Sequence, residues 1–339
     1  MSLPIPSERQ TKRVGIIGLG KMGILHAGIV NQLPNSRIQA VCEKERIVAR
    51  MAKSFLPKGL SFYDDGVEMV KKESLDAVFI TTPIASHAPI IIELANLQPS
   101  LSIFVEKPLA SSVEEASKVC DVVAKSDGVH MVGFQKRHAP LFREAKKRLE
   151  DNVIGELMFF RAYCYSSDVI REGTSWRFRS GTGGVLLDLA PHLIDLLLWL
   201  FGEVESVSAV RRSIYSKSVD DYIHALLTFK SGLSGHMDTC WSVRAFRLPE
   251  ILMEIYGKEG NMILTDDELR IEFDREESKA QVYYNQSFDT SVPFLLANPE
   301  YTAEDQVFMD AIENKSHPAP DFVEAAKVNS LIERIQTAS

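Results

Sequence analysis

The sequence is poor in cysteine and has no excess of positive charge. Its 339 residues include four cysteines and no C-x-x-C pair, which argues against a zinc site. No metal site is expected. The formal net charge of −8 at pH 7 argues against a nucleic-acid partner, because such proteins present a basic face. We therefore expect buried thiols in a reducing compartment, at Cys42, Cys120, Cys164 and Cys240.

The sequence also lacks an uninterrupted apolar run long enough to span a membrane. The longest candidate, "VLLDLAPHLIDLLLWLFG" at 185–202, is interrupted by Asp188, His192 and Asp195, which would be costly in lipid. Residues 1–13 show no apolar core of a secretory signal. We expect a cytoplasmic protein without a membrane partner, in which 185–201 forms a buried helix with a polar edge.

What the sequence does contain is a regular alternation over its first 135 residues. Short V/I/F-rich runs, typical of strands buried on both faces, alternate with amphipathic stretches. The expected strands are "RVGIIG", "IQAVCE", "DAVFITT", "SIFVEKP" and "HMVGF", and the expected helices lie near 21–33, 45–55, 86–97 and 112–126. This rhythm predicts an α/β domain with a doubly wound parallel sheet over 1–135.

The pattern changes after about residue 150. Long strand candidates with few crossovers predict a C-terminal α+β domain over 136–320, built on a large open, mainly antiparallel sheet. Two further helices are expected at 303–315 and 322–336. No repeat or Pro/Ser-rich linker separates the halves, which favours a site between two closely placed domains.

A glycine-rich turn follows the first strand. Its G-x-G-x-x-G pattern lies between an apolar strand and a helix, the context of a Rossmann dinucleotide-binding loop. The helix start offers free N–H groups to a pyrophosphate. The residues expected to bind the cofactor here are Gly18, Leu19, Gly20, Lys21, Met22 and Gly23.

Glu43 ends the second strand, 20 residues after the last glycine of the loop. A carboxylate there accepts hydrogen bonds from ribose hydroxyls and repels a 2′-phosphate, so NAD is expected in preference to NADP. Lys44 and Arg46 lie close by in the sequence, which keeps NADP open as the cofactor.

Two further strand ends are expected at the same sheet edge. "ITTPIASH" places Thr81, Thr82 and Pro83 where a strand leaves the sheet, and we expect them to contact the cofactor. His87 comes one turn into the next helix, where it either contacts the cofactor or serves as a capping or surface residue.

"FVEKP" ends another strand and brings Glu106 and Lys107 to that edge. A lysine beside a nicotinamide can stabilise a developing alkoxide. By position alone, a solvated ion pair between Glu106 and Lys107 is an equal alternative.

Asp188 and His192 are four residues apart, so in one continuous helix they share a face, which Asp195 extends. A carboxylate beside an imidazole sets its tautomer and favours a catalytic role; the alternative is a structural core histidine. Pro191 interrupts the helical pattern, so the helix alternatively starts near Pro191 with Asp188 in the preceding loop.

Together the motifs resemble the Gfo/Idh/MocA oxidoreductase family, which includes glucose–fructose oxidoreductase and inositol 2-dehydrogenase. The matching segments are "GIIGLGKMGILH", "TTPIASHAPIIIELA", "VEKPLA", "GFQKRHAP", "SWRFRSGTGGVLLDLAPHLIDLLLWLFG" and "MEIYGKEGNMIL". One departure is "NLQPSLSIF", where family members often carry Gly-Lys; it puts only the local loop shape in doubt.

The resemblance implies a Rossmann domain, a C-terminal sheet domain that often makes dimers or tetramers, and a final helix, 321–337, that returns to the Rossmann domain. It implies that Lys107, Asp188 and His192 are the catalytic residues and line the substrate pocket. It also matches Gln135 to the cofactor side of the cleft, and Arg137, Trp176 and Arg177 to the substrate side.

The expected activity is hydride transfer between NAD or NADP and a secondary alcohol of a sugar, polyol, cyclitol or sugar derivative. In this hypothesis His192 is the general base, Lys107 stabilises the alkoxide-like oxygen, and Asp188 orients His192 or holds a neighbouring hydroxyl. Two alternatives stay open at this point. One is a dinucleotide-binding regulator without catalysis, and the other is a trans-diol dehydrogenase acting on a non-sugar ring.

Overall fold

The computed structural model describes residues 11–54, 56–246, 248–273, 281–284 and 298–338. The chain divides into two compact units. The first unit draws on residues 1–109, 115–133 and 288–323, and the second on residues 110–114, 134–287 and 324–339. Each unit therefore combines segments that are far apart in the sequence.

The first unit is built on a six-stranded parallel sheet with the order β3-β2-β1-β4-β5-β6. The strands are β1 (Lys12–Ile17), β2 (Ser36–Cys42), β3 (Ser61–Tyr63), β4 (Ala77–Ile80), β5 (Ser102–Glu106) and β6 (His130–Gly133). All four residues of β4 are buried, as expected for a strand covered on both faces. The doubly wound parallel sheet predicted from the sequence is confirmed, with β3 as a short additional edge strand.

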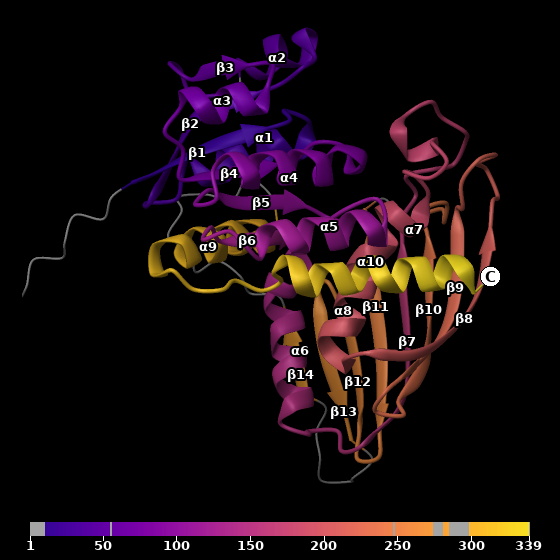
Figure 1. Ribbon diagram of the computed structural model, residues 1–339. Coiled ribbons are helices and arrows are strands. Elements are labelled where there is room, and N and C mark those ends of the chain that lie inside the picture. Colours follow the sequence, from indigo (N-terminus) through magenta and orange to yellow (C-terminus); the bar gives the residue numbers. More distant parts are fainter. Residues whose placement is uncertain (1–10, 55, 247, 274–280, 285–297, 339) are drawn as a thin grey trace, which may run out of the picture. The chain divides into compact units, whose positions relative to one another are not determined.

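Helices follow the strands of this sheet (Figure 1). They are α1 (Lys21–Val30), α2 (Arg46–Ala52), α3 (Gly66–Lys72), α4 (His87–Leu97) and α5 (Val113–Val123), with α9 (Pro299–Asn314) added from the distant C-terminal part of the chain. Helix α9 packs against α1, and its Phe308 and Met309 enter the core that contains Val14 and Phe79. The sequence analysis placed the segment of α9 in the C-terminal domain, whereas the structure includes it in the first unit.

The second unit is built on an eight-stranded sheet with the order β14-β13-β12-β11-β7-β10-β9-β8. The strands are β7 (Leu157–Tyr165), β8 (Val204–Arg212), β9 (Tyr222–Phe229), β10 (Ser234–Cys240), β11 (Glu250–Gly257), β12 (Asn261–Thr265), β13 (Glu268–Glu272) and β14 (Gln281–Tyr284). Only the pairing of β7 with β10 is parallel among these strands, so the predicted mainly antiparallel sheet is confirmed.

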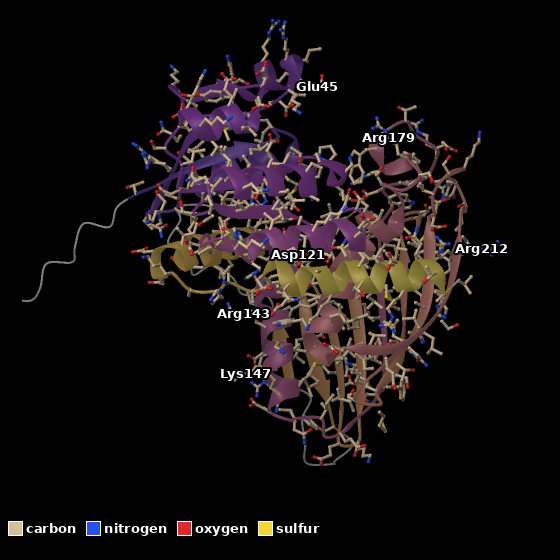
Figure 2. The ribbon with its side chains drawn as sticks, in the orientation of Figure 1. Glu45, Asp121, Arg143, Lys147, Arg179 and Arg212 are labelled. Atoms are coloured by element: carbon tan, nitrogen blue, oxygen red, sulfur yellow. The ribbon has the colours of Figure 1, made fainter. Side chains whose placement is uncertain are left out.

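Helices cover one face of this sheet (Figure 1). The helical elements of the unit are η2 (Gln135–His138), α6 (Pro140–Glu150), η3 (Trp176–Phe178), α7 (Val185–Asp188), α8 (Ala190–Phe201) and most of α10 (Phe322–Thr337). Helix α6 buries Leu141 and Phe142, while Arg143 and Lys147 are exposed on its outer side (Figure 2).

The last helix is divided between the two units. Its first residue, Phe322, belongs to the first unit, where its ring stacks on that of His130 with centroids 5.2 Å apart. From Glu324 onward it belongs to the second unit, where Arg334 donates a hydrogen bond to the carbonyl of Val204 at 2.7 Å. Helix α8 is predominantly buried, as predicted for the apolar run. Within the described part of the chain, no helix combines the length and apolar character needed to cross a bilayer.

Candidate active site

The turn between β1 and α1 has a shape that only glycines allow. Gly18 has a φ of +94°, and a Cβ atom at Gly23 would lie 1.9 Å from the carbonyl oxygen of Gly18. Gly20 caps α1 without any side-chain hydrogen bond, and a Cβ atom there would meet nothing within 4 Å. The loop therefore presents open backbone at a helix N-terminus, as a pyrophosphate requires.

Glu43 directly follows β2 and is tied to this loop. Its Oε2 accepts a hydrogen bond from the backbone N–H of Leu19 at 2.7 Å, and its Oε1 accepts one from the backbone N–H of Glu45 at 2.9 Å. Glu45 starts α2 and is exposed (Figure 2). The carboxylate of Glu43 is thus fixed beside the glycine loop, in the position expected of a ribose-binding group.

The residues after β4 border the same loop. The Oγ1 of Thr81 donates to the carbonyl of Gly18 at 2.7 Å. A Cβ atom on Gly18 would lie 2.9 Å from Cγ2 of Thr82, whose Oγ1 accepts a hydrogen bond from Ser86 at 2.8 Å. The two strand ends therefore form one continuous surface at the carboxyl edge of the parallel sheet, with Pro83 after them.

His87 is the first residue of α4 and is 1% exposed, so its interpretation as a surface residue is wrong. Its Nδ1 lies 2.9 Å from the carbonyl oxygen of Pro108, and its Nε2 lies 2.8 Å from that of Thr82. Burial lowers the pKa of His87, and a neutral ring carries one hydrogen to donate to one of these oxygens. The ring thereby links the loop after β4 to the loop after β5.

Glu106 is the last residue of β5, and its partner is a histidine that the sequence analysis did not single out. Its Oε1 lies 3.2 Å from Nε2 of His26, and its Oε2 accepts a hydrogen bond from the backbone N–H of Lys107 at 3.1 Å. Burial acts to raise the pKa of Glu106, but His26 and Lys107 outweigh it and the pKa is lowered. The Glu106 side chain is 12% exposed, so it is not a solvated carboxylate, although Lys107 still acts on it electrostatically.

In the second unit, the apolar run forms two helices rather than one. Helix α7 ends at Asp188, α8 begins at Ala190, and Pro191 lies in the first turn of α8. The prediction of a single helix is therefore wrong, because a proline is accommodated at a helix start but not inside a helix. Asp188 and His192 are on successive helices, with Asp188 9% exposed and His192 half-buried.

Arg177, in the turn η3, makes an ion pair with Asp188, with 2.9 Å between Nε and Oδ2. The glycines that precede α7 allow the chain to fold back onto this turn. The N–H of Gly184 donates to the carbonyl of Arg177 at 2.8 Å, and a Cβ atom on Gly183 would lie 2.1 Å from that carbonyl oxygen. The structure thus brings Trp176, Arg177 and Asp188 together in the second unit.

Arg137 follows β6 in the turn η2 and is engaged by two carboxylates. It donates to both oxygens of Asp195, from Nε at 2.8 Å and from an Nη at 2.6 Å, and to Glu324 at 2.6 Å. Both Arg137 and its neighbour Gln135 are 7% exposed. Asp195 therefore pairs with Arg137 across η2 and α8.

The structure thus brings the predicted cofactor residues from Gly18 to Lys107 to one edge of the first unit. The predicted residues Gln135, Arg137, Trp176, Arg177, Asp188 and His192 belong to the second unit. Sequence reasoning missed His26 and its second partner, Asp305 of α9. The sequence signal that could have identified His26 was its position in a mostly apolar helix, three residues after Gly23.

Comparisons with known proteins cover both units. Residues 12–134 match the family described as "Oxidoreductase family, NAD-binding Rossmann fold", and residues 142–263 match the family described as "GFO/IDH/MocA C-terminal domain". These two ranges include the glycine loop, Lys107, Asp188 and His192.

Individual relatives have similar lengths. The chain is 28% identical to scyllo-inositol 2-dehydrogenase (NAD(+)) from Bacillus subtilis (strain 168), over 74% of this chain and 73% of the relative. It is 29% identical to levoglucosan dehydrogenase from Pseudarthrobacter phenanthrenivorans, over 78% and 77%. A solved structure of levoglucosan dehydrogenase in complex with NADH and levoglucosan matches with a TM-score of 0.85, at 26% identity and over 97% of each chain.

The first match covers the parallel sheet and the glycine loop, and the second covers much of the unit that contains the eight-stranded sheet. The protein is a member of the Gfo/Idh/MocA family of oxidoreductases and has that family's NAD-binding Rossmann fold.

Proposed function

We propose that this oxidoreductase transfers a hydride between NAD and a secondary alcohol carbon of a sugar, polyol or cyclitol. The observation that carries the proposal is the position of Lys107, which follows β5 at the same carboxyl edge of the parallel sheet as the glycine loop. The relatives named for scyllo-inositol and levoglucosan support this class of substrate.

In this proposal three side chains act on the substrate hydroxyl. His192 accepts the hydroxyl proton as general base, and the Lys107 ammonium stabilises the negative charge that develops on the oxygen. Asp188, held by Arg177, orients His192 or binds a neighbouring hydroxyl. Bound NAD supplies the hydride acceptor.

The residues around the glycine loop fit NAD. The open space over Gly20 leaves room for the pyrophosphate, and the carboxylate of Glu43, fixed by Leu19, favours ribose hydroxyls over a 2′-phosphate. We therefore propose that NAD is used in preference to NADP, with Thr81, Thr82 and Pro83 bordering the cofactor and His87 supporting the loop behind them.

The proposal is tested with a panel of polyols, cyclitols, sugars and nucleotide sugars, each with NAD and with NADP, by following the absorbance of reduced cofactor. Turnover of at least one polyhydroxylated compound is expected with NAD. The variant His192→Asn is expected to slow turnover by on the order of a hundredfold or more while NADH affinity stays nearly unchanged. Tight NADH binding without turnover of any member of the panel would contradict the proposal and favour a regulatory protein.

We also propose that two copies of the chain associate through the uncovered face of the eight-stranded sheet. Phe159 and Leu226 are 40% and 50% exposed, and Phe159 stacks on Tyr256 with ring centroids 4.5 Å apart. Such exposed apolar side chains on a sheet face favour association. Light scattering of the purified protein is expected to give a dimer or tetramer, and Leu226→Asp is expected to reduce the mass. A monomer in the unaltered protein would contradict this.

The cytoplasm is the proposed location. No disulfide joins any of the four cysteines, all of which lie in described residues, and three of them are buried, as is usual in a reducing compartment.

A further inference from the structure

The first unit contains a buried row of ionisable side chains that ends at Lys107. His26 of α1 is 0% exposed and lies between two carboxylates. Its Nδ1 is 2.8 Å from Oδ1 of Asp305 on α9, and its Nε2 is 3.2 Å from Oε1 of Glu106 on β5. The other oxygen of Glu106 accepts the backbone N–H of Lys107.

The hydrogen bonds of His26 define its charge. Ionised carboxylates only accept hydrogen bonds, so a ring that bonds one carboxylate through each nitrogen must carry a hydrogen on both. Burial acts to lower the pKa of His26, but Asp305 and Glu106 outweigh it and raise the pKa well above 6.5. The rings of Phe79 and Phe104, with centroids 5.5 and 5.1 Å from the imidazole, offer π faces to the cation.

The remaining acidic groups around His26 come from the same helix as Asp305. Glu304 is 1% exposed, and burial raises its pKa well above 4.5, which favours its neutral form. Glu300, also buried, lies near Glu304. The groups that face His26 are therefore Asp305 and Glu304 from α9 and Glu106 from β5. Burial also raises the pKa of Asp305, and the charge of His26 and its hydrogen bond oppose that rise.

His26, Glu304 and Asp305 each have one nitrogen or oxygen atom that can bind a metal ion, and these three atoms lie within 4.8 Å of one another. The 2.8 Å separation of Nδ1 and Oδ1 is that of a hydrogen bond, which a shared proton explains without a metal. A row of alternating charge results, in the order Asp305, His26, Glu106 and Lys107.

We propose that His26 is a positioning residue for Lys107. Its imidazolium keeps the largely buried Glu106 ionised and in place, and Glu106 in turn fixes the backbone of Lys107. This inference rests on the proposed role of Lys107 in the reaction. It extends the proposed function to His26, which lies on α1, the helix that follows the glycine loop.

Loss of the His26 cation has a consequence of known sign. Without it, Glu106 is a largely buried carboxylate that lacks its main cationic partner, so its pKa rises. The protonated carboxyl is a weaker acceptor for the backbone N–H of Lys107 than the carboxylate is. Since the proposed role of Lys107 requires a fixed position, the acidic limb of the pH–rate profile moves to higher pH.

The experiment compares His26→Gln and Asp305→Asn with the unaltered protein. The amide in His26→Gln keeps one hydrogen-bond donor but carries no positive charge. The amide in Asp305→Asn keeps a hydrogen bond to His26 but lacks the negative charge that favours the charged form of the imidazole. The matched control is His130→Gln. This half-buried histidine starts β6, and its Nε2 lies 3.1 Å from Oγ of Ser126. Gly133, three residues further along β6, is the strand partner of Glu106.

Three measurements are made on each protein: NADH affinity, the pH at which the carbon-13 signal of the Glu106 carboxyl titrates, and the pH profile of kcat on the best substrate of the panel. In His26→Gln we expect the Glu106 signal and the acidic limb to move up by on the order of one pH unit, with NADH affinity within about twofold. A smaller shift is expected in Asp305→Asn and none in His130→Gln.

Each outcome has a definite meaning. An unchanged Glu106 titration in folded His26→Gln and Asp305→Asn would overturn the inference, as would an equal shift in His130→Gln. If the panel gives no turnover, the proposed function fails, while the carbon-13 titration still decides whether His26 controls the charge of Glu106. If His26→Gln does not fold, Asp305→Asn carries the test.

Discussion

The Nε atom of Arg177 lies 2.9 Å from Oδ2 of Asp188, and this ion pair joins the turn η3 to the end of α7. Asp188 is 9% exposed and precedes the helix that carries His192. The carboxylate is therefore held by a cation immediately before the proposed general base. Because the Arg177 side chain is 38% exposed, this pair is expected to orient the Asp188 carboxylate more than to stabilise the fold.

Replacing Arg177 is expected to weaken catalysis rather than folding. In Arg177→Met we expect kcat/KM to fall by about tenfold or more, a loss of roughly 1.4 kcal/mol of transition-state stabilisation. The melting temperature is expected to change little, because the Arg177 side chain is 38% exposed. Steady-state kinetics and thermal unfolding check both points.

The control is Arg179→Met, which removes an exposed arginine of the same loop (Figure 2). It is expected to retain kcat/KM. Equal losses in the two variants would show that the loop as a whole, rather than the pair with Asp188, matters for turnover.

Two glycine substitutions are expected to separate cofactor binding from folding. In Gly20→Ala the new methyl group meets nothing within 4 Å, so the protein should fold normally, but the methyl group occupies the space over the helix start. We expect NADH affinity to fall by about tenfold or more. In Gly23→Ala the methyl group would lie 1.9 Å from the carbonyl of Gly18, so both stability and affinity should fall.

These expectations are checked by fluorescence titration with NADH and by thermal unfolding of each variant without cofactor. Undiminished NADH affinity in Gly20→Ala would mean that the pyrophosphate does not approach the backbone of this loop.

The pair of Arg137 and Asp195 is expected to contribute chiefly to stability. Both side chains are buried and joined by two hydrogen bonds, so Arg137→Met leaves an uncompensated buried carboxylate. We expect the free energy of unfolding to fall by about 3–5 kcal/mol. Denaturant titration measures the free energy of unfolding. The control is Lys72→Met, because the exposed ion pair of Lys72 with Glu68 should contribute little to that free energy. A large rise in KM with unchanged stability would instead support the predicted substrate contact of Arg137.

His130 is expected to make the protein sensitive to acid. Burial lowers its pKa to about 4, whereas an unfolded histidine titrates near 6.5. Between these values the unfolded chain binds a proton that the folded chain does not, so stability is lost as the pH falls through this window. Between pH 7 and pH 4.5 the unaltered protein should lose on the order of 2 kcal/mol more than His130→Gln. Parallel losses in the two proteins, measured by urea unfolding, would contradict this role.

The regular strands and helices of the first unit follow from local sequence pattern. The runs that become β1, β4 and β5 each contain a short apolar segment, and apolar segments of that length between turn signals predict buried strands. Strand β3 has three half-buried residues, too few for a periodic signal, and it was missed. The helix break at Leu189 was one of two alternatives, because Pro191 is compatible with a kink or with a helix start.

By itself the sequence determined the two folding patterns, the glycine loop and the strand ends that carry Glu43, Thr81 and Lys107, because each depends on residues close together in the chain. Only the tertiary structure decided that Asp305 reaches His26, that Glu106 pairs with that histidine, and that Asp195 pairs with Arg137. Partners separated by 279, 80 and 58 positions leave no periodic signal, since their distance depends on how whole elements pack. The same packing set the charge of His26, because burial and two facing carboxylates exist only in the folded chain.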